Sequence, residues 1–250
     1  MALSIGGVEI PNAEEKFVEM SHGTTRYIEA GDGYPTILLH GVGYAEGGHN
    51  WLLNIGPLSS KLKVIAVDAL AWGKGEGFLQ QEYSFAYLVD FLREFQDAIG
   101  YDKTNLVGHS MGGRVIGHVA HQLGRRVVGL GGADTLKFPR SHSKDGYAKI
   151  IRALESDYDR AVRNFVESMF TGDTPESVRS TIAEGMIGVP AAVGIGAMTG
   201  MMNDDGLPGL IEGLEIPIVL IISHGSSVDM DGAGELGISL RFVTTEGHFV

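Results

Sequence analysis

The amino-acid sequence predicts an α/β fold, in which a mostly parallel central sheet carries helices on both faces and a helical lid is inserted between two strands. Short apolar runs without polar alternation are separated by helical segments, which is typical of parallel strands buried on both faces. The segment 137–212 interrupts this rhythm with helical patterns and no convincing strand. A serine flanked by glycines stands between a predicted strand and a predicted helix.

The length and composition of the chain limit the number of domains and the kinds of partner and chemistry that are expected. At about 150 residues per domain, a chain of 250 residues predicts one large domain or one domain with an insertion. A net charge of −12 argues against binding to nucleic acids or anionic membranes. With no cysteine, disulfides, thiolate metal sites and a cysteine nucleophile are excluded. No apolar run reaches the roughly 18 residues of a membrane span, and no signal peptide is visible, so a soluble cytoplasmic protein is expected.

The strands are predicted from short runs rich in β-branched residues. Loose alternation over residues 8–29 predicts an antiparallel pair at one edge of the sheet. Apolar runs then predict buried strands at residues 36–40, 64–68, 104–108, 127–131, 216–222 and 240–244.

Helices are predicted between these strands from the spacing of apolar residues. One helix is expected within residues 51–62 and another over residues 114–123. Between them, apolar residues recur at i, i+3, i+4 and i+7 from Phe85 to Ile99, and Gly100 ends that helix.

The segment 137–212 is predicted to be the helical lid, with residues 1–136 and 213–250 forming the core. Apolar residues from Ile151 to Met169 form one amphipathic stripe. Thr174 followed by Pro175 marks a helix start, and Pro190 marks another. The alternative is a pair of ordinary crossover helices joined by long loops.

The hexapeptide from Gly108 to Gly113 has the spacing G-x-S-x-G, directly after a predicted strand and before a predicted helix. A sharp turn here would strain the backbone of Ser110 and lift its hydroxyl above the edge of the sheet. The first free N–H groups of the helix would then face a nearby anion. The alternative is a turn used only for packing.

These motifs, in this order, resemble the α/β-hydrolase family over most of the chain. The similar segments are residues 38–43, which look like an oxyanion loop, residues 64–68 and 72–75, residues 107–113, residues 216–220, and residues 246–249. The resemblance implies a hydrolase whose Ser110 is the nucleophile. It places the catalytic base at His248, for which the alternative is a solvated histidine near the chain end. It also implies that His40 supports the oxyanion loop, while His109 packs beside the nucleophile.

The acid that orients the base is the least certain member of the predicted triad. The family pattern Gly-x-x-Asp is altered here, because Val228 stands where the acid is expected. Asp229, one residue later, is the first candidate. Asp134, after the preceding strand, is the alternative, since some family members carry the acid there. Asp231 could also substitute in a rearranged loop.

Two backbone donors are expected to stabilise a developing oxyanion. Met111 supplies the first, because it follows the nucleophile. The second is expected from the loop after His40, at Val42. His118 and His121 lie three residues apart on one helix, but no third ligand is evident, so neither a metal nor another cofactor is expected.

The predicted partner is a small-molecule substrate, and the sequence does not define an oligomeric state. The leading hypothesis is hydrolysis of a small or medium carboxylic ester or lactone through an acyl-enzyme. The second is hydrolysis of a carbon–carbon bond, as in hydrolases of meta-cleavage products, although His109 departs from the asparagine usual in that subgroup. The third is a non-catalytic receptor for a small ligand on the same fold.

Overall fold

The computed structural model describes most of the chain, namely residues 2–5, 7–42, 47–69, 84–136, 144–170, 174, 176–204, 209, 211–223, 228, 230–244 and 248. The strands are β1 (Ala2–Ile5), β2 (Val8–Pro11), β3 (Ala13–Met20), β4 (Gly23–Ala30), β5 (Tyr34–Leu39), β6 (Leu62–Val67), β7 (Thr104–His109), β8 (Val127–Ala133), β9 (Ile218–Ser223) and β10 (Ser239–Val243). The helices outside the predicted lid are α1 (Leu52–Ser59), α2 (Phe85–Ala98), α3 (Met111–Leu123) and α9 (Met230–Glu235), with short 3₁₀ turns at Gly47–Trp51 and Gly124–Arg126.

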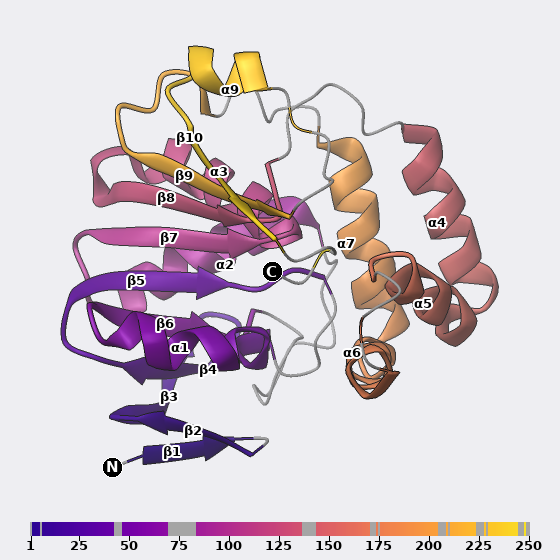
Figure 1. Cartoon of the computed structure of the whole chain (residues 1–250), viewed down its shortest axis with the longest axis horizontal. Coiled ribbons are helices and arrows are strands. Elements are labelled where there is room, and N and C mark those ends of the chain that lie inside the picture. The colour runs from indigo at the N-terminus through magenta and orange to yellow at the C-terminus, as the bar shows by residue number, and fades with distance from the viewer. Residues whose placement is uncertain are drawn as a thin grey trace.

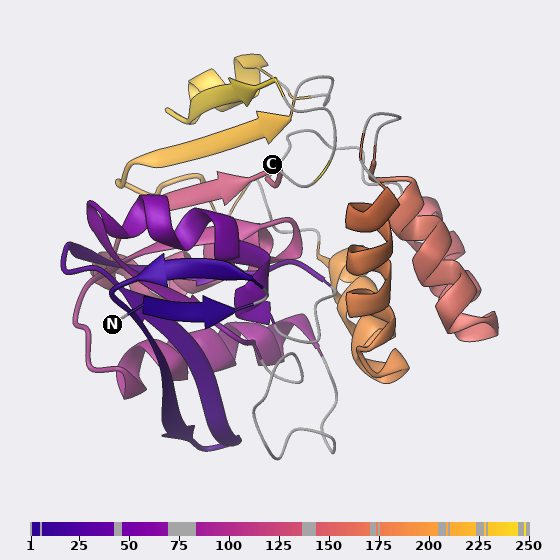
Figure 2. The same ribbon diagram turned by 60° about the horizontal axis from the view of Figure 1, so that its bottom comes forward.

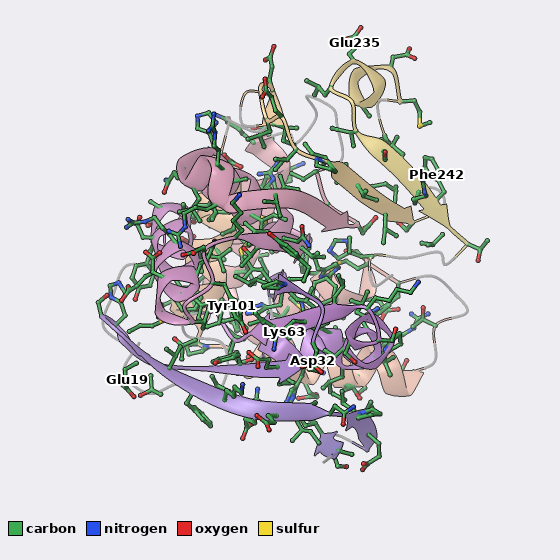
Figure 3. All side chains as sticks on the ribbon, turned by 90° about the vertical axis from the view of Figure 1, so that its left-hand side faces the viewer. Glu19, Asp32, Lys63, Tyr101, Glu235 and Phe242 are labelled. Carbon is green, nitrogen blue, oxygen red and sulfur yellow. The ribbon has the colours of Figure 1, made fainter. Side chains whose placement is uncertain are left out.

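Eight strands form the central sheet in the order β10-β9-β8-β7-β5-β6-β4-β3. The pairs from β10 to β6 are parallel, whereas β4 pairs antiparallel with both β6 and β3. Figure 3 shows the two edge strands at opposite ends of the sheet, with Glu19 on β3 and Phe242 on β10. The mostly parallel sheet is therefore confirmed.

Helices cover both faces of this sheet, as predicted. Successive residues of β5 point to opposite sides, so that Ile37 and Leu39 join one apolar cluster while Leu38 joins a second. The first cluster packs under α2 and α3, and the second under α1 (Figure 1). Burial on both faces explains why the strand sequences are continuously apolar rather than alternating.

The amino-terminal region differs from the single antiparallel pair that was predicted. It contains two pairs, because β1 and β2 form a separate two-stranded sheet before β3 and β4. Figure 2 shows this small sheet beside α1, and Ile10 of β2 is buried in the same cluster as Ile55 of α1. The extra pair thus extends the apolar cover on that face of the sheet.

In the described part of the chain, the longer helices between β8 and β9 stand beyond the carboxyl ends of the parallel strands (Figure 1). They are α4 (Lys144–Ser156), α5 (Tyr158–Glu167), α6 (Glu176–Ile187) and α7 (Ala191–Asn203). The single stripe predicted from Ile151 to Met169 is wrong in one respect, because the helix breaks at Asp157. The Asp157 carboxylate accepts a hydrogen bond from the N–H of Arg160 at 3.2 Å and so begins a new helix.

Within the described part of the chain, no single helix has the length and apolar character needed to cross a membrane. The segments Arg179–Ile187 and Ala191–Asn203 meet those criteria only when taken together, and they are bent by 100° relative to each other.

Candidate active site

Ser110 stands at the tip of the turn between β7 and α3, as predicted. Its backbone has φ +53° and ψ −120°, a left-handed region that a residue with a side chain rarely adopts. The neighbouring strand holds this conformation, since the Ser110 N–H donates to the Ala133 carbonyl at 3.1 Å. The Ser110 carbonyl accepts from the Gly113 N–H at 3.1 Å and from the Thr135 hydroxyl.

The glycines around Ser110 are required by close backbone approach. A Cβ atom on Gly108 would lie 2.4 Å from the carbonyl carbon of Gly112, and one on Gly112 would lie 2.5 Å from the His40 carbonyl oxygen. Gly108 therefore lets the turn close on itself, and Gly112 lets it pack against the end of β5. These contacts explain the G-x-S-x-G spacing in physical terms.

We expect Gly112→Ala to lower the free energy of unfolding by several kcal/mol, because two backbone segments would have to separate. Gly117→Ala is the matched control in the same helix, since its Cβ would meet nothing within 4 Å. That change should raise stability by about 0.5–1 kcal/mol through helix propensity. Urea unfolding of both variants measures the difference, and equal stabilities would contradict the packing described here.

His248 is held by Asp134. The Nδ1–H group of His248 donates to the Asp134 carboxylate at 2.6 Å. Asp134 is buried, has φ +44°, and accepts a further hydrogen bond from the Ser223 hydroxyl at 2.8 Å. A carboxylate on Nδ1 leaves Nε2 as the nitrogen of this imidazole that can accept a proton.

The backbone of His248 is fixed at two further points. Its N–H donates to the Met169 carbonyl at 3.0 Å, and its carbonyl accepts a hydrogen bond from Nε2 of His109, also at 3.0 Å. The rings of His109 and His248 lie with their centroids 4.7 Å apart. His248 therefore contacts the last residue of β7 and the segments that follow β8 and α5.

Ser110 and His248 line the same pocket. The other lining residues are His109 and apolar side chains, namely Val42, Phe165, Met169, Met198 and Met201. The structure thus brings the predicted nucleophile, the predicted base and Val42 to one cavity.

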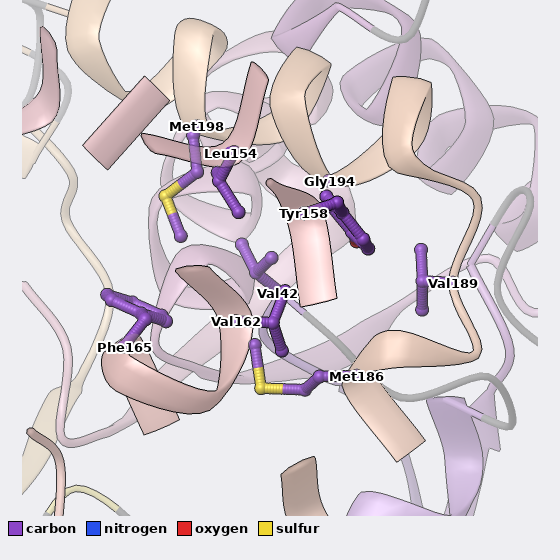
Figure 4. A pocket seen from close by; sticks show the side chains of 9 residues that line it. All are labelled: Val42, Leu154, Tyr158, Val162, Phe165, Met186, Val189, Gly194 and Met198. Atoms are coloured by element: carbon purple, nitrogen blue, oxygen red, sulfur yellow. The ribbon is translucent and has the colours of Figure 1, made fainter. Parts of the chain in front are cut away.

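A second pocket shares Val42, Phe165 and Met198 with the first and is lined by residues of α4 to α7. Figure 4 shows Val42 surrounded by side chains of this helical segment. Its lining is apolar apart from the hydroxyl of Tyr158, and includes Leu154, Val162, Met186, Val189 and Gly194. Its described lining residues include no charged side chain, which suits a neutral, apolar group.

His40 is buried, and both of its ring nitrogens are hydrogen-bonded to the backbone. Its Nε2 accepts the N–H of Ala69 at 3.0 Å, so Nδ1 carries the proton that is donated to the Gly41 carbonyl at 2.7 Å. Burial lowers the pKa of His40 and keeps the ring neutral. A Cβ on Gly41 would lie 2.9 Å from the Ser110 Cβ, so this loop runs directly beside the serine. Gly43 lies outside the described residues.

Burial, followed by the charge of His248, lowers the pKa of His109 to about 3. The unfolded chain, with a histidine pKa near 6.5, therefore binds a proton between about pH 6.5 and pH 3 that the folded protein does not. Stability is full above this window and falls as the pH drops through it. We expect His109 to account for a loss of about 1.4 kcal/mol by pH 5.5.

This loss is measured by urea unfolding at pH 7.5 and pH 5.5. His109→Gln, which cannot titrate, should lose less stability than the natural protein between these two values. An identical loss in both proteins would contradict a neutral, buried His109.

Two predicted acids have different outcomes. Asp229 lies outside the described residues, so its position is not described, whereas Asp134 contacts His248. Sequence reasoning missed Ser223 and Thr135, which hold the Asp134 carboxylate and the Ser110 carbonyl. The sequence could have pointed to both residues, because they are polar and stand at the carboxyl ends of buried strands.

His118 makes a different contact from the one considered in the sequence. Its Nε2 lies 2.9 Å from the Asp204 carboxylate at the end of α7, and Arg114 Nη1 donates to the Met201 carbonyl of the same helix. Among the described residues, no group of three or more histidine, aspartate or glutamate side chains is arranged to hold a metal ion.

Residues 34–171, more than half of the chain, match the family model described as the alpha/beta hydrolase fold. The chain belongs to the α/β-hydrolase fold family. The matched segment includes strands β5 to β8, the loop after β5 and the serine turn.

A relative within this family is 2-hydroxy-6-oxo-6-(2'-aminophenyl)hexa-2,4-dienoic acid hydrolase of Metapseudomonas resinovorans, which is 31% identical over 179 residues. The match covers 66% of this α/β-hydrolase chain and 61% of that relative. Matches to other relatives, among them hydrolases of Burkholderia cepacia and Comamonas testosteroni, cover about a third of their length.

Solved structures show the same fold. The enol-lactonase from Burkholderia xenovorans LB400 superposes with a TM-score of 0.78 at 16% identity, covering 94% of this chain and 93% of its own. The 2-hydroxy-6-oxo-6-phenylhexa-2,4-dienoate hydrolase from Rhodococcus sp. strain RHA1 gives 0.75 at 20% identity, covering 95% and 92%. Relatives and neighbours of this α/β-hydrolase thus include enzymes that cleave different kinds of bond.

Proposed function

We propose that this α/β-hydrolase is a serine hydrolase that cleaves a small or medium carboxylic ester or lactone through an acyl-enzyme. One observation carries the proposal. Ser110 and His248 line one pocket, and Nδ1 of His248 is bonded at 2.6 Å to the buried carboxylate of Asp134. This is the arrangement in which an imidazole can remove the proton from a serine hydroxyl.

In the proposed reaction, Nε2 of His248 takes the proton of Ser110 as Oγ attacks the substrate carbonyl carbon. The same proton then passes to the leaving alcohol, and the acyl group stays on Oγ. A water molecule, deprotonated by His248, releases the acid and restores Ser110. Asp134 takes the place of the acid, because its carboxylate fixes the ring and stabilises the imidazolium that forms.

The oxyanion of the tetrahedral intermediate would be stabilised by two backbone N–H groups. Met111 is the first residue of α3, so its N–H is free of a partner within that helix. Val42 lines the pocket beside Ser110 and follows Gly41, which packs against the serine. We propose the N–H groups of Met111 and Val42 as this pair of donors.

We also propose that residues 137–212, which include α4 to α7, form a lid over a core of residues 1–136 and 213–250. The apolar cavity between these helices is the site proposed for the acyl part of the substrate. An uncharged hydrophobic acyl group fits its lining, since a carboxylate would lose hydration there without gaining a cation.

The test is labelling with a fluorophosphonate probe, which reacts with activated serines, followed by mapping of the modified residue. The proposal expects one label, on Ser110, and none in the Ser110→Ala variant. Labelling of another serine, or no labelling of the folded protein, would overturn it. Tight binding of an ester without turnover would instead favour a non-catalytic receptor.

Hydrolysis of a carbon–carbon bond is the second candidate, favoured by the 31% identity to the dienoic acid hydrolase of M. resinovorans. Parallel assays with p-nitrophenyl acetate and with a chromogenic dienoate ring-fission product separate the two. Faster turnover of the dienoate would replace the ester hydrolase proposal, whereas turnover of the acetate alone would support it.

A further inference from the structure

The hydrogen bond from Nδ1 of His248 to the Asp134 carboxylate fixes one point of the imidazole ring. The direction of Nε2 therefore depends on where the backbone of His248 is held. The two backbone contacts, to Met169 and to His109, provide that restraint.

The contact from His109 has a defined polarity. A carbonyl oxygen only accepts, so Nε2 of His109 must carry the proton that is donated to His248. The low pKa of His109 is consistent with one proton on this ring, which leaves Nδ1 unprotonated. Nδ1 faces Gly41, where an added Cβ would lie only 3.1 Å away.

His109 is also rigidly placed. It is 5% exposed, ends β7, and is the residue directly before Ser110. Trp51 presents its ring edge-on at 6.4 Å between centroids, and the ring of His248 covers another side at 4.7 Å. The donor is thus attached to the same strand end that carries the nucleophile.

We propose that His109 is a positioning residue, whose Nε2–H bond to the carbonyl of His248 sets the base at the correct place relative to Ser110. The inference rests on the proposed function. One strand end then fixes both partners of the proton transfer, because Ser110 is the next residue along the chain. His109 itself does not touch the reacting atoms in this role.

Neutrality of His109 is part of the same role. The groups that face it are the imidazoles of His248 and His40 and the carboxylate of Asp134. In the proposed reaction His248 becomes positively charged, and a second cation with its ring centroid only 4.7 Å away would oppose that step. Burial keeps His109 neutral, so the ring supplies a donor without a charge.

The experiment compares His109→Leu, which removes the donor, with His109→Gln, whose amide N–H can reach a similar position. For p-nitrophenyl ester hydrolysis, we expect Leu to lower kcat by about 10²-fold, the effect of a small misplacement of a catalytic group. KM should stay within about threefold, and the Gln variant should keep kcat within about fivefold of the natural protein. His121→Leu, on the exposed face of α3, is the control and should change neither value.

A second readout does not depend on turnover. The proton between His248 and Asp134 should give a downfield NMR resonance, identified by its loss in Asp134→Asn. We expect this signal to persist in the Gln variant and to broaden or vanish in the Leu variant, with both variants folded by circular dichroism.

The two readouts separate failure of the inference from failure of the proposed function. If the natural protein neither labels with fluorophosphonate nor turns over, but the resonance responds as expected, the hydrolase proposal fails and the positioning role stands. If the natural protein labels and the Leu variant keeps its kcat and the resonance, the inference is overturned. Equal loss of kcat in the Leu and Gln variants would also overturn it, because the donor would not matter.

Discussion

Replacing Ser110 with alanine is expected to lower p-nitrophenyl ester turnover by at least about 10³-fold, because alanine lacks the hydroxyl that is the proposed nucleophile. The fold should be unaffected. Alanine keeps a Cβ at the same positive φ, and the hydrogen bonds at this residue involve its backbone N–H and carbonyl. Initial rates measured on enzyme matched by circular dichroism give the comparison.

Ser168→Ala is a suitable control for protein handling and purity, since that serine is exposed and its hydroxyl donates to the Phe165 carbonyl. It should retain the natural rate. Retention of more than a few per cent of activity in Ser110→Ala would exclude this serine as the nucleophile.

The second large effect is expected at Asp134. An asparagine there can turn its amide N–H toward Nδ1 of His248, which moves the ring proton to Nε2 and leaves no base for Ser110. We expect kcat to fall by about 10³–10⁴-fold with little change in KM. Steady-state kinetics of ester hydrolysis measure both constants.

Two companion variants make this result specific. Ser223→Ala removes one hydrogen bond to the Asp134 carboxylate but not the charge, so its effect on kcat should be much smaller, about tenfold or less. Asp229→Asn should leave kcat close to that of the natural protein. A larger loss in Asp229→Asn than in Asp134→Asn would return the role of acid to Asp229.

Much of the fold could be predicted because strands that are buried on both faces have continuously apolar sequences. Strands such as β5 and β6 touch an apolar cluster on each side, and their continuous apolar runs follow from that. The break between α4 and α5 is less evident in the sequence. The apolar spacing continues across Asp157, and only the capping hydrogen bond of that carboxylate ends one helix and begins the next.

The site could be predicted in part for a similar reason. Ser110 has a local signature, since Gly108 and Gly112 are required by contacts within a few residues or with the adjacent strand end. The acid has none. Asp134 and Asp229 each follow a predicted strand at the same edge of the sheet, and linear spacing cannot rank them. The contact of Asp134 with His248 joins residues 114 positions apart, which only the folded chain reveals.

The bond from the His248 N–H to the Met169 carbonyl joins the proposed base to the segment that follows α5 in the proposed lid. Met169 follows α5, so an outward swing of that helix must either break this bond or pull the imidazole away from the serine. A hydrolase built in this way would be inactive while the proposed lid is open and active once the lid has closed. Water that reaches Ser110 in such an open state would then meet a serine whose proton His248 is not placed to remove.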